Sequence, residues 1–220
     1  MSLNLWKFAH ILLFVYWLGA DLGVFLLARA AKRADLSFEQ RALLLKMALL
    51  IDVTPRIAFV LMFPVGLHLA IGLGLIAVGP MLLTAVWCLA FAWLALILAI
   101  GRHEGTDSGA ALMGWNLRLQ ALLGLLILGL GAASLLGYGP FLTNWLGLKV
   151  LLFGFIFVCS IMIDVRFRPL MPAFARLAVE GSRPDIEAAI SGAIEGAIRW
   201  VLALYGLLVA IAFLGTVKPL

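Results

Sequence analysis

The chain has 220 residues, of which 65% are hydrophobic and only 12% are Asp, Glu, Lys or Arg. This composition excludes an ordinary soluble domain, because runs of about 20 apolar residues are typical of helices that cross a bilayer. The net charge of +5 does not indicate a nucleic-acid-binding protein, since the basic residues fall in short segments between apolar runs. We therefore expect an all-α, polytopic membrane protein whose partner is the lipid bilayer.

Six apolar runs predict a bundle of six transmembrane helices in a single integral membrane domain, residues 1–220. The expected spans are 5–27, 57–78, 81–100, 119–136, 145–165 and 200–214. Glycine and proline at 79–80 and 137–140 are typical of tight turns. The second and third spans, and the fourth and fifth, are therefore expected to form hairpins.

Two amphipathic helices are expected outside the spans, at 38–52 and 184–199. The first opens with the pattern of a capping box, from Ser37 to Gln40, and Pro55 is expected to interrupt it. The second begins with Pro184 in its first turn and is expected to run unbroken into the sixth span. A further proline, Pro64, predicts a kink in the second span.

The positions of the basic residues predict the orientation of the chain. Thirteen of the 16 Lys and Arg residues lie in the segments after the first, third and fifth spans. By the positive-inside rule these segments are cytoplasmic, so both termini are expected to lie outside the cytoplasm. We expect a multi-pass protein of the cell inner membrane.

Counting residues from the ends of the spans places His10 and Lys149 at the same depth. His10 is five residues past Leu5, and Lys149 is four residues past Trp145, on two helices that both enter from outside. His68 is expected nearer the midplane by roughly 7 Å at 1.5 Å per residue. His10 and His68 remain an alternative pair. A polar side chain inside the membrane is a functional candidate.

A second polar layer is expected near the cytoplasmic ends of the spans, with two interpretations open. The charges there could form inward-facing ion pairs between helices, or they could simply reach the headgroups. Asp21 is deeper than the others and could be buried against Arg56. The layer comprises Asp21, Asp52, Arg56, Asp164 and Arg168.

Imidazole and amine inside an apolar bundle indicate haem b, which a histidine can ligate from a helix. Lys149 could serve as a second ligand or as a cation that pairs with a propionate. Copper is the alternative metal for His10 and His68, with Met62 as a thioether ligand. An ion or proton pathway through Asp21, Asp164 and His68 is a third interpretation.

Three short motifs resemble the HemJ-type protoporphyrinogen oxidases and the broader CopD-like membrane family. They are Trp-Lys-Phe-Ala-His-Ile at 6–11, Arg-Ile at 56–57 with Leu-Met-Phe-Pro at 61–64, and Trp-Leu-Gly-Leu-Lys at 145–149. The resemblance implies a haem-containing oxidase in which His10 ligates the haem and Lys149 contacts haem or substrate. Lys149 and Arg56 are accordingly the candidate catalytic residues. Family members have about four spans, whereas six are predicted here.

The leading hypothesis is an integral membrane haem b-binding redox protein, with a porphyrin substrate or a membrane electron acceptor as its partner. The alternatives are a CopD-like copper or ion transport protein and a non-enzymatic membrane subunit. The residues leave open whether the chain is an oxidoreductase at all. They also leave open the second axial ligand, the roles of Asp21 and Asp164, and the oligomeric state, including a homo-oligomer.

Overall fold

The computed structural model describes residues 2–103, 105–141 and 143–218, and every regular element in these ranges is a helix. The helices are α1 (Leu3–Ala31), α2 (Phe38–Gly72), α3 (Pro80–Arg102), α4 (Asp107–Leu135), α5 (Asn144–Phe167), α6 (Leu170–Glu180) and α7 (Pro184–Val217). Six segments are long and apolar enough to cross a membrane: α1, α2, α3, α4 and α7, and the continuous stretch Asn144–Glu180, which comprises α5 and α6. The predicted all-α, six-span fold is confirmed.

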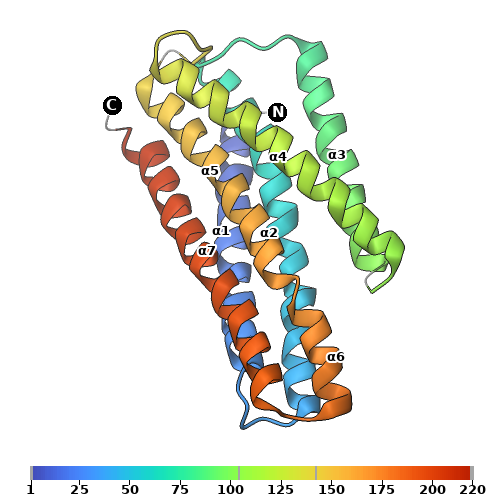
Figure 1. The fold of residues 1–220 in the computed structure, drawn as a ribbon. Helices are drawn as coiled ribbons and strands as arrows, with labels where there is room; N and C mark the ends of the chain where they lie inside the picture. The colour runs from blue at the N-terminus through green and yellow to red at the C-terminus, as the bar shows by residue number, and fades with distance from the viewer. Residues whose placement is uncertain (1, 104, 142, 219–220) are drawn as a thin grey trace.

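The helices form an elongated bundle whose two termini lie near the same end (Figure 1). α1 packs along α2, and α5 packs against both α4 and α7. α3 lies at the outside of the bundle, where it contacts α2 and α4. The connections between α1 and α2 and between α6 and α7 lie at the opposite end from the termini.

An aromatic core joins the α1–α2 pair to α3 and α5. At its centre Phe59 of α2 contacts Trp17, Trp93, Phe153 and Phe157, with ring centroids 4.8–5.9 Å apart. Ring pairs at these distances contribute about 0.5–1.5 kcal/mol each beyond the apolar area that they bury. This core separates the polar residues at one end of the bundle from those at the other.

α2 differs from the expected short helix followed by a separate span. It is one continuous helix of 35 residues that contains both Pro55 and Pro64, so the prediction that Pro55 interrupts it is wrong. A proline inside a helix removes one backbone hydrogen bond and costs about 3 kcal/mol. Both prolines are buried in the bundle, and we attribute the continuity of α2 to this packing. The helix ends at Gly72, before the expected position 78, and the chain then turns through Gly74 at φ +69°.

Beyond the spans, the first turns of α2 and α7 pack with α6 to form a helical extension, defined as residues 38–50, 170–180 and 184–195. It has its own apolar core, which includes Leu45, Leu170, Phe174 and Ile190. The capping box of Ser37 and Gln40 and the start of α7 at Pro184 are both confirmed, and α7 continues unbroken into its span. α6 was not predicted from the sequence.

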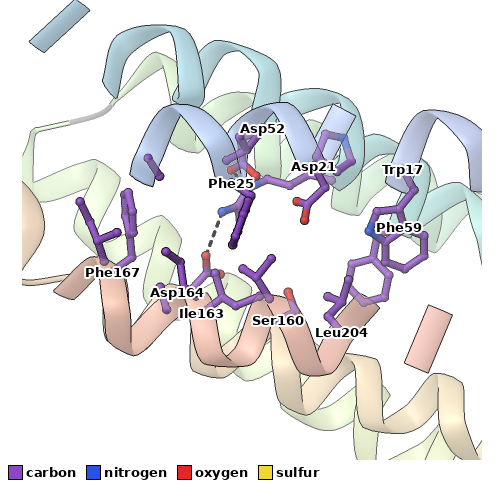
Figure 2. Close-up of a pocket in the computed structure, with 18 residues that line it drawn as sticks. Trp17, Asp21, Phe25, Asp52, Phe59, Ser160, Ile163, Asp164, Phe167 and Leu204 are labelled. Carbon is purple, nitrogen blue, oxygen red and sulfur yellow. Dashed lines mark hydrogen bonds and ion pairs between the residues drawn. The ribbon is translucent and has the colours of Figure 1, made fainter. Parts of the chain in front are cut away.

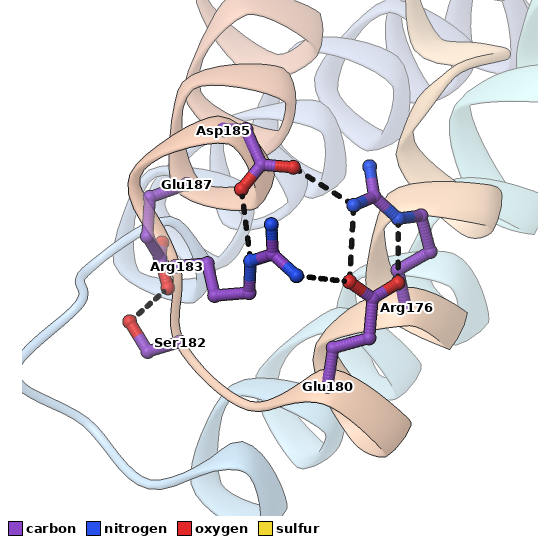
Figure 3. A network of polar contacts seen from close by, with 6 residues as sticks. All are labelled: Arg176, Glu180, Ser182, Arg183, Asp185 and Glu187. Carbon is purple, nitrogen blue, oxygen red and sulfur yellow. Dashed lines mark hydrogen bonds and ion pairs between the residues drawn. The ribbon is translucent and has the colours of Figure 1, made fainter.

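Ion pairs hold the helical extension together. Arg41 is only 1% exposed; it donates to both carboxylate oxygens of Glu187 at 2.8 and 2.9 Å and to the carbonyl oxygen of Ala31 at 2.9 Å. At the surface, Arg176 and Arg183 form a network with Glu180 and Asp185 (Figure 3). The arginine hydrogen bonds hold the pKa of Glu187, Glu180 and Asp185 below the usual values of these carboxyl groups.

Candidate functional site

His10 on α1 lies against the backbone of α2. A β-carbon placed on Gly66 would come within 3.2 Å of His10 Cε1 and 3.5 Å of His10 Nδ1, so the glycine makes room for the ring. Nδ1 is buried and has no hydrogen-bond partner among the described residues. A buried polar atom without a partner is costly, and such atoms are often found where a ligand or a water completes the site.

Lys149 on α5 lies against α7 near the same end of the bundle. A β-carbon on Gly215 would come within 2.6 Å of Lys149 Nζ, so the amine lies over this glycine. The described residues include no carboxylate within 4.0 Å of the amine. Lys149 is the sixth residue of α5 and His10 the eighth residue of α1, and both helices begin at the end of the bundle where the termini lie (Figure 1). The two residues expected at a shared depth therefore lie in one region of the bundle.

His68 is held by two tryptophans on the outer part of α2. Its ring stacks on Trp6 of α1 with centroids 4.0 Å apart and planes 5° from parallel. Trp87 of α3 donates its indole N–H to His68 Nε2 at 3.0 Å. These contacts already occupy one ring nitrogen and one ring face. His68 thus links α1, α2 and α3, and the structure gives no contact between it and His10.

Arg56 lies in the second polar layer, away from His10. It is ten residues from Gly66 on α2, which corresponds to about 15 Å along the helix. Its guanidinium donates to Asp52 Oδ2 at 2.5 Å and to Asp164 Oδ1 at 2.9 Å. The ion-pair interpretation therefore describes Arg56, Asp52 and Asp164, and the partner of Asp164 is Arg56 of α2 rather than the nearby Arg168 of its own chain segment.

A cavity of about 100 Å³ lies beside this ion pair, between α1, α2, α5 and α7. Figure 2 shows the Asp21 carboxylate directed into it, with Asp164 and Ser160 on the facing wall. Asp21 takes part in no ion pair among the described residues, so the expected pairing of Asp21 with Arg56 is not found. Most of the remaining wall is aromatic or aliphatic.

Sequence reasoning missed a buried polar pair on α4. Asn116 and Gln120 are 1% and 2% exposed, and Trp93 of α3 donates its indole N–H to Asn116 Oδ1 at 2.8 Å. The Gln120 side-chain oxygen has no partner among the described residues. Their spacing of four residues was the available signal, but the predicted span began at 119 and left Asn116 outside it.

The donor atoms can be compared with those that haem or copper would need. His10 fits a haem ligand, because its half-buried imidazole makes no hydrogen bond at either nitrogen with the described residues, which leaves Nε2, the nitrogen that ordinarily binds haem iron, free of protein partners. His68 fits less well, because Trp87 occupies its Nε2. No group of three His, Cys, Asp or Glu side chains suited to a metal ion occurs in the described part of the chain, and Met62 lies in the aromatic core. This donor set is poorer for copper than for haem.

Comparison of the chain with protein-family models, curated proteins and solved structures finds no match.

Proposed function

We propose that this chain is an integral membrane protein that binds haem b and has a redox role, with His10 as an axial ligand. The observation that carries the proposal is the half-buried imidazole of His10, which has no hydrogen-bond partner among the described residues and lies at the same end of the bundle as the amine of Lys149. Imidazole is the commonest protein ligand of haem iron in helix bundles, and an apolar setting tunes its potential.

Lys149 has a separate role in this proposal. Its amine lies within the bundle with no carboxylate partner among the described residues. A cation at this position suits a propionate, which a haem and a porphyrinogen substrate both carry. Bound haem would supply one-electron chemistry, and the resemblance to HemJ-type oxidases suggests oxidation of a porphyrinogen. Electron transfer to a membrane acceptor is the other redox role that these residues allow.

Arg56 has a different role from the catalytic one that the sequence suggested. It is bonded to Asp52 and Asp164 and lies about 15 Å along α2 from the glycine that faces His10. We therefore assign it to joining α2 and α5. The membrane placement, in the inner membrane with both termini outside the cytoplasm, follows from the distribution of Lys and Arg.

Visible spectroscopy tests the proposal. The full-length protein, purified in detergent from cells supplied with a haem precursor, is expected to show a Soret band and, after dithionite reduction, the sharp bands of b-type haem. If the purified protein is colourless and titration with haem produces no saturable spectral change, the proposal fails. Copper analysis of the same sample tests the alternative: stoichiometric copper without haem would favour metal handling.

The enzymatic part of the proposal needs its own measurement. With a quinone as the electron acceptor, three molecules of which take up the six electrons and six protons removed, haem-loaded protein is expected to convert protoporphyrinogen to fluorescent protoporphyrin faster than free haem at the same concentration. A Lys149→Met variant that keeps its Soret band but loses this activity would place the amine at the substrate. Equal activity in the two proteins would contradict that role and leave electron transfer as the redox function.

A further inference from the structure

The cavity between α1, α2, α5 and α7 lies in the polar layer of Arg56 and is separate from the region of His10. Residues from four helices contribute to its wall, and its volume is about 100 Å³. For comparison, an engineered apolar cavity of about 150 Å³ holds one benzene molecule. The space is therefore suited to a small molecule or to a few waters, and it is too small for a porphyrin.

The charges around the cavity do not balance. Three carboxylates, those of Asp21, Asp52 and Asp164, face a single guanidinium, that of Arg56. Arg56 bonds to Asp52 and to Oδ1 of Asp164, and Asp21 is in no ion pair among the described residues. Apolar surroundings make unpaired carboxylates costly, so this arrangement favours a positively charged occupant.

Asp164 gives independent evidence for a missing partner. Its side chain is only 6% exposed, and it lines the cavity. Its second oxygen, Oδ2, is buried and accepts no hydrogen bond from the described residues. A buried carboxylate oxygen ordinarily accepts at least one hydrogen bond. A donor placed in the cavity would satisfy it together with Asp21, whose carboxylate points into the same space (Figure 2).

The rest of the wall determines which kind of cation fits. Trp17, Phe25, Phe59 and Phe167 line the cavity, and aromatic ring faces attract cations and also accommodate apolar groups. An inorganic metal ion would need several converging oxygen ligands, and no such group of three is found in the described residues. An organic ammonium ion fits both kinds of wall residue, because its charge can pair with the carboxylates and its apolar part can pack against the aromatic rings.

We propose that this cavity binds a small organic ammonium ion, with its charged group at Asp21 and Asp164 Oδ2 and its apolar group among the aromatic rings. The site does not depend on haem, because His10 lies in the other polar layer. Such a ligand could be a transported substrate or a regulator. Both roles require that it binds in this cavity, so binding is the property to measure.

Calorimetric titration of the full-length protein in detergent at pH 7 tests the proposal with propylammonium as the probe, which is smaller than benzene. Saturable binding of propylammonium is expected, at least tenfold tighter than that of 1-propanol, which has the same carbon chain without the charge. Asp21→Asn is expected to weaken binding at least tenfold. Asp35→Asn, which removes an exposed carboxylate in the α1–α2 connection, is the matched control and should bind as the native protein does.

A second variant keeps the test valid if Asp21→Asn does not fold. Ser160→Phe retains every carboxylate and fills the cavity, so it is expected to abolish binding while the protein still elutes as one symmetrical peak. Equal binding of 1-propanol would overturn the proposal. So would unchanged affinity in a folded Asp21→Asn or Ser160→Phe variant, or heats from sodium ions alone with none from propylammonium.

Discussion

The imidazole of His10 lies directly over Gly66 of the neighbouring helix, so close that a side chain at position 66 would require the ring to shift. A β-carbon at position 66 would approach His10 Cε1 to 3.2 Å, closer than ordinary van der Waals contact. The position of the proposed haem ligand therefore depends on a glycine two helical turns beyond Phe59, the central residue of the aromatic core.

Gly66→Leu is expected to displace His10 and reduce the haem content of the purified protein. Overpacking of this kind costs about 1–3 kcal/mol, which a thermal unfolding scan in detergent would register. Gly19→Leu is the control, because no atom lies within 4 Å of a β-carbon at that glycine of α1. Equal haem content in the two variants would show that the contact with Gly66 does not position the imidazole.

The pair of Arg56 and Asp164 is expected to stabilise the packing of α2 against α5. Arg56→Gln leaves a buried carboxylate without its partner, which costs about 3 kcal/mol. In a double-mutant cycle, adding Asp164→Asn to Arg56→Gln should recover part of this loss, with a coupling of about 1–3 kcal/mol. The exposed pair of Arg33 and Asp35 should show no resolvable coupling. Strict additivity at Arg56 and Asp164 would contradict the structure.

Close packing of α4 on α5 depends on Gly131. A β-carbon there would lie 2.4 Å from the backbone nitrogen of Leu151, and a backbone atom cannot move aside cheaply. Gly131→Ala is therefore expected to lower stability by about 1–3 kcal/mol through separation of the two helices. Gly129→Ala, in the same helix but with open space around it, should be neutral or stabilising by up to about 1 kcal/mol. Thermal unfolding midpoints of the two variants check this. A lower midpoint for Gly129→Ala than for Gly131→Ala would be inconsistent with this helix contact.

The helical extension should lose stability in acid through Glu187. Arg41 holds the pKa of this carboxyl below its ordinary value of 4.5. The folded form thus binds its proton less readily than the unfolded form does, so the stabilisation is complete above pH 4.5 and is lost as pH falls through the folded pKa. Glu187→Gln and Arg41→Gln should each reduce the change in unfolding midpoint between pH 6 and pH 3.5. A native pH dependence in Arg41→Gln would exclude this pair as its cause.

The number of membrane spans could be read from the sequence because each span needs about 20 apolar residues, whatever it packs against. The continuity of α2 could not, because it depends on tertiary packing around Pro55, whereas the local rule for proline predicts a break. By contrast, the similar depth of His10 and Lys149 along the bundle could be predicted by counting residues from the ends of the spans. The direction of each side chain depends on helix rotation, which is set by glycines 66 and 215 on other helices.

Side-chain pairing across helices was the least predictable part. The spacing of Asp52 and Arg56 indicated their contact, but nothing local indicated that Asp164 would pair with Arg56. The partners of His68, Trp6 and Trp87, lie on two other helices, and nothing near His68 in the sequence indicates them. Such contacts require knowledge of which helices are neighbours.

The most direct test of the account is the reduced-minus-oxidised visible spectrum of purified His10→Ala protein beside that of His103→Ala. His103 is an exposed histidine at the end of α3 and serves as the matched control. The account predicts b-type haem bands at native intensity in His103→Ala and their loss in His10→Ala, with both proteins eluting as folded species. Native haem bands in folded His10→Ala would contradict the assignment of His10 as the haem ligand.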